Sequence, residues 1–187
     1  AHGFRAYNLG SVSQTPLNSY EIIKYLVDSS NTSLLILDVF DKTFANTGLE
    51  SSADLIQNLP SNEAVLGMAC DLRDLRALNL LMLRYTEPRE ISVPKDPFYV
   101  GLGFGARTDS VKVPLDTRKD QKYALDRQQR HFFHAIVELC QQKGIHLFIS
   151  SHYARQVRSK AYHIPLTNVI DSTLAGTNIP YLYYTFE

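Results

Sequence analysis

The sequence predicts an α/β fold of the three-layer α/β/α type, in which helices cover both faces of a mostly parallel sheet. Three strand-like apolar runs, at residues 34–40, 145–149 and 179–186, are separated by stretches with helical spacing. Such alternation is typical of right-handed βαβ units. The run at residues 34–40 is apolar at nearly every position, so we expect helices on both faces of the sheet.

A fourth strand is expected at residues 4–9, and helices connect the strands. Thr15 followed by Pro16 is typical of a helix start, because Thr accepts from an early N–H group and Pro has no N–H to leave unpaired. The remaining helices are expected at residues 51–58, 62–85, 123–143 and 164–175, the last of them starting at an Ile-Pro pair. The helix at residues 62–85 carries a wide apolar face, so we expect it to pack against the sheet or against a partner.

With 187 residues, the chain is long enough for a single domain with a sizeable core. Residues 87–120 read as an irregular insertion, because four prolines and three glycines interrupt this stretch. Long segments of this kind often act as lids or binding loops, so we expect the insertion over the carboxyl ends of the strands. Because the chain starts without Met and stops within a strand-like run, we expect it to be a fragment of a longer domain.

Composition excludes several classes of partner. Lys plus Arg and Asp plus Glu balance at 19 each, so no overall field attracts nucleic acid or an anionic membrane. No apolar run is long enough to cross a bilayer and no signal peptide is present, so any membrane association would involve segments outside this sequence. Cys70 and Cys140 read as buried thiols rather than a disulfide. The glycines of residues 101–105 do not match a dinucleotide loop, and we predict no cofactor.

The strand at residues 145–149 ends in Ser150, Ser151 and His152, directly after a helix that breaks at Gly144. Ligands bind outside the carboxyl ends of strands in open α/β sheets, so Ser151 and His152 are candidate catalytic residues. Neighbours on an extended chain point in opposite directions, which argues against the two acting as one dyad. Asp38 interrupts the 34–40 run near its end and is either a third catalytic candidate or a cap for the next loop.

Two further segments carry candidate binding residues. The loop that contains Gly10 and Ser11 leads into a helix, so its N–H groups form either an oxyanion site or an ordinary turn. A basic cluster that includes Arg155 could bind an anionic substrate or face solvent. His131 and His134 stand three apart on a helix, but no further Cys or His completes a ligand set, so we predict no metal site.

The segment from Tyr7 to Pro16, Tyr-Asn-Leu-Gly-Ser-Val-Ser-Gln-Thr-Pro, resembles the second conserved block of the SGNH/GDSL-type hydrolases. Residues 34–41 then stand where that superfamily has its third strand. Residues 1–60 together resemble SGNH-like proteins of bacterial envelopes, including the periplasm. The resemblance implies a flavodoxin-like three-layer fold and hydrolysis or transfer of an acyl group on a carbohydrate-type substrate.

The resemblance also assigns roles to individual residues. Gly10 corresponds to an oxyanion N–H donor, with Ser11 beside it, and Asn8 lies in the same block as a candidate substrate-binding residue. The nucleophile block of the family would lie before Ala1, and its Asp-x-x-His block after Glu187. Two hypotheses therefore stand: an acyl-ester hydrolase or acyltransferase of the cell envelope, and a non-catalytic binding or assembly module on the same fold.

Overall fold

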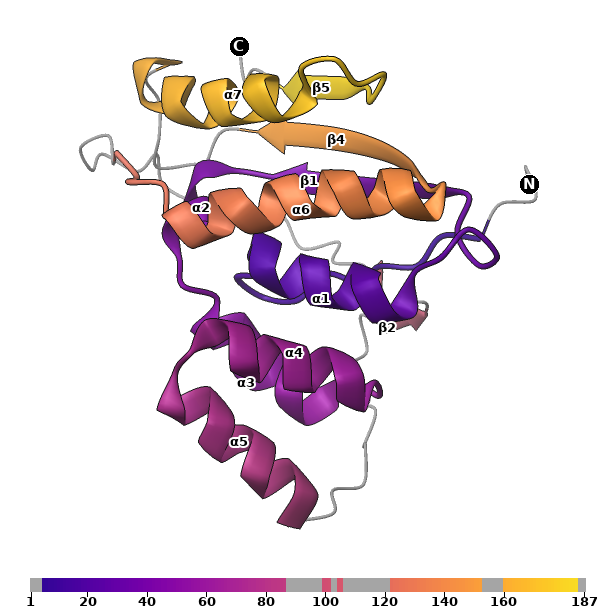
Figure 1. Ribbon diagram of the computed structural model, residues 1–187, viewed down its shortest axis with the longest axis vertical. Coiled ribbons are helices and arrows are strands. Elements are labelled where there is room, and N and C mark those ends of the chain that lie inside the picture. The colour runs from indigo at the N-terminus through magenta and orange to yellow at the C-terminus, as the bar shows by residue number, and fades with distance from the viewer. Residues whose placement is uncertain (1–4, 87–98, 102–103, 106–121, 153–159, 185–187) are drawn as a thin grey trace.

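The computed structural model describes residues 5–86, 99–101, 104–105, 122–152 and 160–184. These residues form seven helices and five strands (Figure 1). The helices are α1 (Pro16–Leu26), α2 (Asp41–Ala45), α3 (Leu49–Asn58), α4 (Asn62–Leu72), α5 (Leu75–Thr86), α6 (Arg127–Lys143) and α7 (Lys160–Leu174). The strands are β1 (Leu34–Val39), β2 (Tyr99–Gly101), β3 (Phe104–Gly105), β4 (His146–His152) and β5 (Tyr181–Tyr184).

The main sheet has three parallel strands in the order β1-β4-β5. The predicted α/β class and parallel pairing are confirmed for these strands, with Leu35 opposite Leu147 and Ile149 opposite Tyr181. The strand predicted at residues 4–9 is wrong for its described part, because residues 5–9 form no ladder. The strand propensity of these residues is not sufficient, because a strand forms only where the backbone of an adjacent strand pairs with its N–H and C=O groups.

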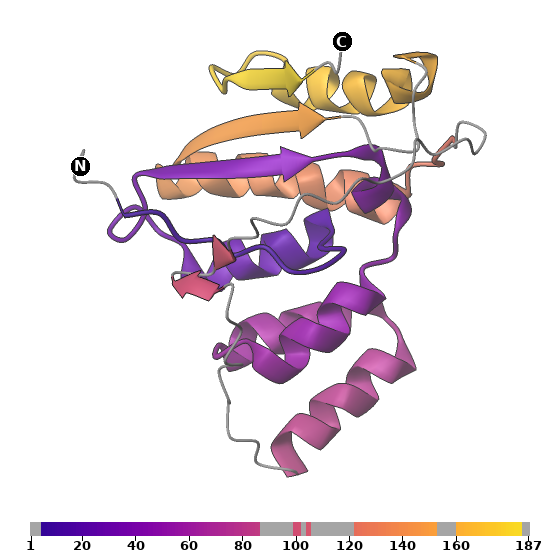
Figure 2. The same cartoon turned by 180° about the vertical axis from the view of Figure 1, so that it is seen from behind.

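Only one face of this sheet is covered by described helices. Helices α6 and α7 pack their apolar residues against β1 and β4, and Figures 1 and 2 place both on the same side of the strands. On the opposite face Leu34 is 55% and Ile36 62% exposed. The prediction that residues 34–40 are buried on both faces is therefore wrong, and the finer three-layer arrangement is not seen in the described residues.

Local signals placed the ends of two helices correctly. Thr15 precedes α1, and Asn18 Oδ1 accepts hydrogen bonds from Thr15 N–H (3.1 Å) and Oγ1 (2.8 Å). Gly144 ends α6 with a φ of 67°, a left-handed conformation that glycine adopts without strain. Lys143 Nζ donates to the carbonyls of Ile23 (2.9 Å), Lys24 (2.7 Å) and Val27 (2.6 Å), which satisfies the C-terminus of α1.

The single helix expected at residues 62–85 is instead two helices. Arg73 has a φ of 52° and ends α4. Asp74 then caps α5, because its Oδ1 accepts from the Arg76 N–H at 2.8 Å. The break lets α5 fold back along α3 and α4, which a continuous helix cannot do. Cys70, predicted to be buried, is exposed on α4.

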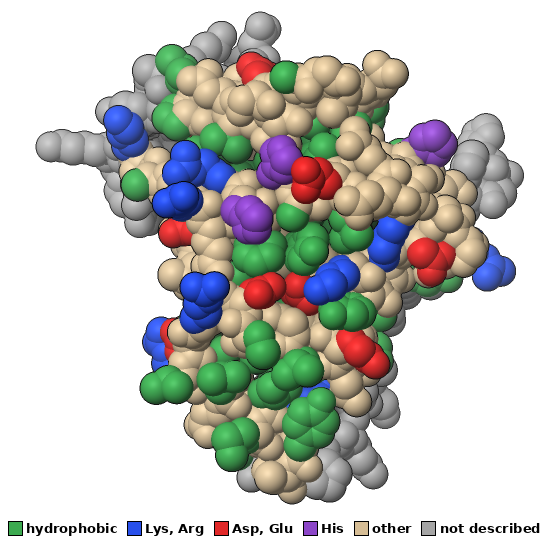
Figure 3. Space-filling model, viewed as in Figure 1, with side chains coloured by type: hydrophobic (Ala, Val, Ile, Leu, Met, Phe, Trp, Pro, Cys, Tyr) green, Lys and Arg blue, Asp and Glu red, His purple; other side chains and the backbone are tan. Residues whose placement is uncertain are grey.

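Helix α5 is apolar on its outer side as well as its packed side. Leu75 is 82% exposed and Met82 67%, and Figure 3 shows hydrophobic side chains gathered over α4 and α5. A helix that is apolar all round normally has a second contact surface. None of the described helices is both long and apolar enough to cross a membrane.

Helices α1 and α4 meet through a buried carboxyl group. Glu21 of α1 is completely buried, and a Cβ on Gly67 of α4 would lie 1.8 Å from its Oε2. Only glycine therefore leaves room for this side chain in its present position. Lys24 Nζ lies 3.8 Å from Glu21 Oε1. Burial raises the pKa of Glu21 from 4.5 to about 7, with Lys24 lowering it and Asp71 raising it further.

Two predicted boundaries differ from the structure. Helix α7 starts at Lys160 rather than at Ile164, so Pro165 lies inside it. The insertion at residues 87–120 lies mostly outside the described residues, and its described part is the antiparallel pair β2–β3. Figure 2 shows this pair beside α1 and away from the carboxyl ends of β1 and β4, where we had expected the segment.

Candidate functional site

The carboxyl ends of β1 and β4 bring together candidate residues from distant parts of the sequence. Parallel pairing sets Asp38 opposite Ser150 and Val39 opposite Ser151. Ser150 Oγ donates to Asp38 Oδ1 at 2.7 Å, so the two strands are also joined by their side chains. Asp38 is exposed at this edge and is thus accessible to a ligand.

Ser151 faces the interior rather than the edge of the sheet. It lies on the same side of β4 as Leu147 and Ile149, and it is 1% exposed. Its Oγ makes no hydrogen bond within the part of the chain that the structure describes. A hydroxyl in this position cannot meet a substrate without local movement. His152 ends β4, with its side chain outside the described set, and Arg155 lies outside the described residues altogether.

A buried carboxyl–imidazole pair lies at the same end of the fold. Asp41 starts α2 two residues after β1, and its Oδ2 contacts Nδ1 of His163 on α7. Asp41 is 1% and His163 2% exposed. His163 continues the buried stripe of Leu166 and Ile170, so a polar pair closes the apolar layer between α7 and the sheet.

Burial dominates the electrostatics of this pair. It raises the pKa of the Asp41 carboxyl, and the charge of His163 partly offsets that rise. The same carboxylate also acts on Tyr123. Burial raises the pKa of the Tyr123 phenol, and the negative charge of Asp41 raises it further. A carboxylate that orients an imidazole through Nδ1 is the arrangement used by general bases in acyl transfer.

Both predicted oxyanion donors already have acceptors in their own loop. Gly10 N–H donates to Asn8 Oδ1 at 2.9 Å, and Ser11 N–H donates to Gln14 Oε1 at 2.8 Å. Ser11 Oγ also donates to Asp54 Oδ2 of α3 at 3.0 Å. A substrate oxygen could take these N–H groups only by displacing the side-chain amides. The first contact of a Cβ at Gly10 is that same Asn8 Oδ1, at 3.0 Å.

Buried polar side chains fix the start of α1 next to this loop. Gln129 of α6 accepts from Leu17 N–H at 3.0 Å through Oε1 and donates to Thr47 O at 3.1 Å through Nε2. Gly48 has a φ of 92°, and a Cβ there would lie 2.6 Å from Thr15 Oγ1. The segment after α2 therefore packs tightly against the first turn of α1, which positions the Gly10 loop.

No protein-family model, curated protein or solved structure matches this chain. Among the described residues, no three His, Cys, Asp or Glu side chains are grouped as metal ligands would be. Sequence reasoning missed His163, whose only signal was an imidazole at helical spacing from Leu166 and Ile170.

Proposed function

We propose that this chain belongs to an SGNH-like acyl-ester hydrolase or acyltransferase that acts on carbohydrate-type substrates in the bacterial cell envelope or periplasm. The proposal combines the resemblance of the Tyr7–Pro16 segment with one observation, the polar groups at the carboxyl ends of β1 and β4. Parallel α/β sheets bind ligands at this edge. Asp38 is exposed there, and the buried Asp41–His163 pair includes the residue two positions after the end of β1.

Acyl transfer needs N–H donors aimed at the developing oxyanion. The loop N–H groups of Gly10 and Ser11 are suitable donors, because their acceptors are side-chain amide oxygens, which a substrate oxygen can replace without breaking a backbone ladder. Asn8 must then release the Gly10 N–H group before substrate binds, and it is also a candidate substrate contact. Asp41 and His163 are too deeply buried to touch substrate, so they position the start of α2 rather than transfer protons.

The nucleophile is not Ser150 or Ser151. The Ser150 hydroxyl donates a hydrogen bond to Asp38 and joins the two strands, and Ser151 is almost completely buried. Asp38 and His152 stay candidates for proton transfer, since Asp38 is the last residue but one of β1 and His152 ends β4 at the same edge.

We expect Ser151→Ala to leave turnover of p-nitrophenyl acetate by the native protein unchanged. A true nucleophile would lose nearly all activity, whereas a buried hydroxyl next to the site affects mainly stability. Ser30→Ala, in the loop that precedes β1, is the matched control. Loss of turnover with Ser151→Ala alone would show that the nucleophile has been misassigned. If the native protein hydrolysed the ester no faster than buffer alone, the proposed esterase activity would be excluded.

The second hypothesis, a non-catalytic binding or assembly module, also has a specific observation in its favour. In the described conformation the Gly10 and Ser11 N–H groups are both occupied, and Ser151 is closed off from solvent. A binding module needs no free oxyanion donor, so this closed loop could be its working state. Binding of a carbohydrate ester without its hydrolysis would favour this alternative.

A further inference from the structure

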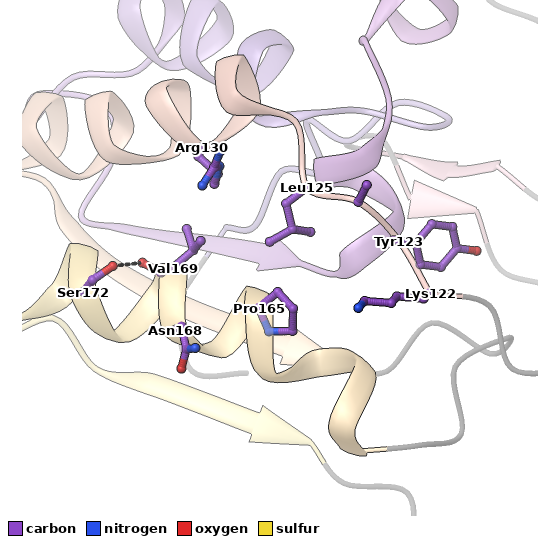
Figure 4. Close-up of a pocket in the computed structure, with 9 residues that line it drawn as sticks. Lys122, Tyr123, Leu125, Arg130, Pro165, Asn168, Val169 and Ser172 are labelled. Atoms are coloured by element: carbon purple, nitrogen blue, oxygen red, sulfur yellow. Dashed lines mark hydrogen bonds between the residues drawn. The ribbon is translucent and has the colours of Figure 1, made fainter.

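A groove of about 610 Å³ lies between α7 and the segment that leads into α6. Pro165, Asn168, Val169 and Ser172 form one wall, and their spacing of three to four residues places them on one face of α7. The opposite wall comes from residues 122–125 and Arg130 (Figure 4). The volume falls in the range of small-molecule sites in proteins, about 300–1,000 Å³.

Among the described residues that line this groove, Lys122 and Arg130 are cationic and none carries a carboxylate. Neither Lys122 nor Arg130 forms an ion pair or side-chain hydrogen bond within the described ranges of the chain. Asp126, one turn before Arg130, is occupied as a helix cap and accepts from Gln128 N–H (2.7 Å) and Gln129 N–H (3.2 Å). In a chain with no net charge, the groove is thus a local positive site.

Apolar surface lies between the two cations. Leu125, Pro165 and Val169 face the groove in Figure 4, where the Lys122 side chain extends toward Pro165. Ser172 Oγ donates to Val169 O at 3.0 Å, so that hydroxyl keeps its lone pairs for a ligand donor. A ligand that fits must combine an apolar body with a negative group.

We propose that this groove binds a small organic anion, an apolar ring or short chain that carries one phosphate or carboxylate group. The Arg130 guanidinium pairs with two oxygens of that group, and Lys122, across the apolar surface, adds to the positive potential of the groove. The apolar body packs against Leu125, Pro165 and Val169. This site lies between helices rather than at the strand ends, and the inference does not depend on the ester chemistry proposed above.

The test is a titration of the native protein with phenyl phosphate, monitored by two-dimensional ¹H–¹⁵N NMR spectra. We expect saturable shifts at the amides of Ala124, Arg130, Asn168 and Val169. Arg130→Gln should weaken binding at least about tenfold, because a charge-assisted pair is lost. Added NaCl should weaken it as well, because the cations are exposed. Benzoate should bind at the same amides, and uncharged benzyl alcohol at least about tenfold more weakly.

Arg76→Gln, at an exposed arginine of α5 that pairs with Asp74 at 2.8 Å, should leave the affinity unchanged. Anionic vesicles distinguish a lipid headgroup from a soluble anion: vesicle binding that is lost with Arg130→Gln would support the same site with lipid as the source. Shifts that do not saturate, that lie elsewhere, or that persist in a folded Arg130→Gln variant would overturn the proposal. Equal binding of benzyl alcohol would also overturn it.

Discussion

Asp41→Ala should lower the free energy of unfolding by about 1–3 kcal/mol, the usual cost of removing the partner of a buried polar group. The variant leaves the His163 imidazole, itself 2% exposed, without the carboxylate that contacts its Nδ1. Asp41→Asn should cost less, because its amide oxygen still accepts a hydrogen bond in nearly the same volume. Urea denaturation monitored by circular dichroism measures both values.

The matched control is Asp171→Ala, at an exposed acid on α7. Surface substitutions of this kind usually change stability by no more than about 0.5 kcal/mol. Removing Asp41 and His163 together should cost less than the sum of the single variants, because the two side chains contact each other and their shared interaction is then lost only once. Similar small losses for Asp41→Ala and Asp171→Ala would mean that the buried pair does not stabilise the fold.

Glu21→Gln should stabilise the protein at about pH 8 and leave it almost unchanged at about pH 5. The folded pKa of Glu21 is about 7, above its ordinary 4.5, so the folded state holds this proton more tightly than the unfolded chain does. The stability that protonated Glu21 contributes to the folded state is therefore fully present at low pH and is lost as the pH rises through 7. Raising a pKa from 4.5 to about 7 corresponds to about 3 kcal/mol, most of which should appear between these two pH values.

Urea denaturation at both pH values provides the measurement, and Glu50→Gln, at an exposed acid of α3, is the control. Two charged residues face Glu21: Lys24 of its own helix lowers the pKa of Glu21, and Asp71 of α4 raises it. If Glu21→Gln and wild type lose stability in parallel as the pH rises, the titrating group lies elsewhere.

Features that depend on neighbouring residues could be predicted from the sequence. Thr15 and Pro16 start a helix, and Gly144 ends one, because caps and turns act over a few residues. The parallel strands followed from the alternation of apolar runs and helical spacing. The break at Arg73 could not be predicted in this way, since a non-glycine residue with positive φ carries no compositional signal.

Features that depend on tertiary contacts were missed or only half predicted. The apolar run at residues 34–40 indicated burial on two faces, but burial depends on what packs against a strand rather than on the strand itself. Asp38 and Ser150 were placed at the same sheet edge by the pairing rule, and the structure joins them. The Asp41–His163 pair joins two residues far apart in the sequence, and no local pattern connects them.

The most direct test of the proposed function is acetate release from an O-acetylated disaccharide by the native protein and by two variants of Gly10. Gly10→Pro removes the N–H group itself, whereas Gly10→Ala keeps it and brings a methyl group only against the tip of Asn8. We predict that Gly10→Pro loses about a hundredfold to a thousandfold in turnover. Gly10→Ala should stay near wild type. Equal turnover by the folded Pro and Ala variants would show that the Gly10 N–H does not stabilise the transition state, and would contradict the proposed site.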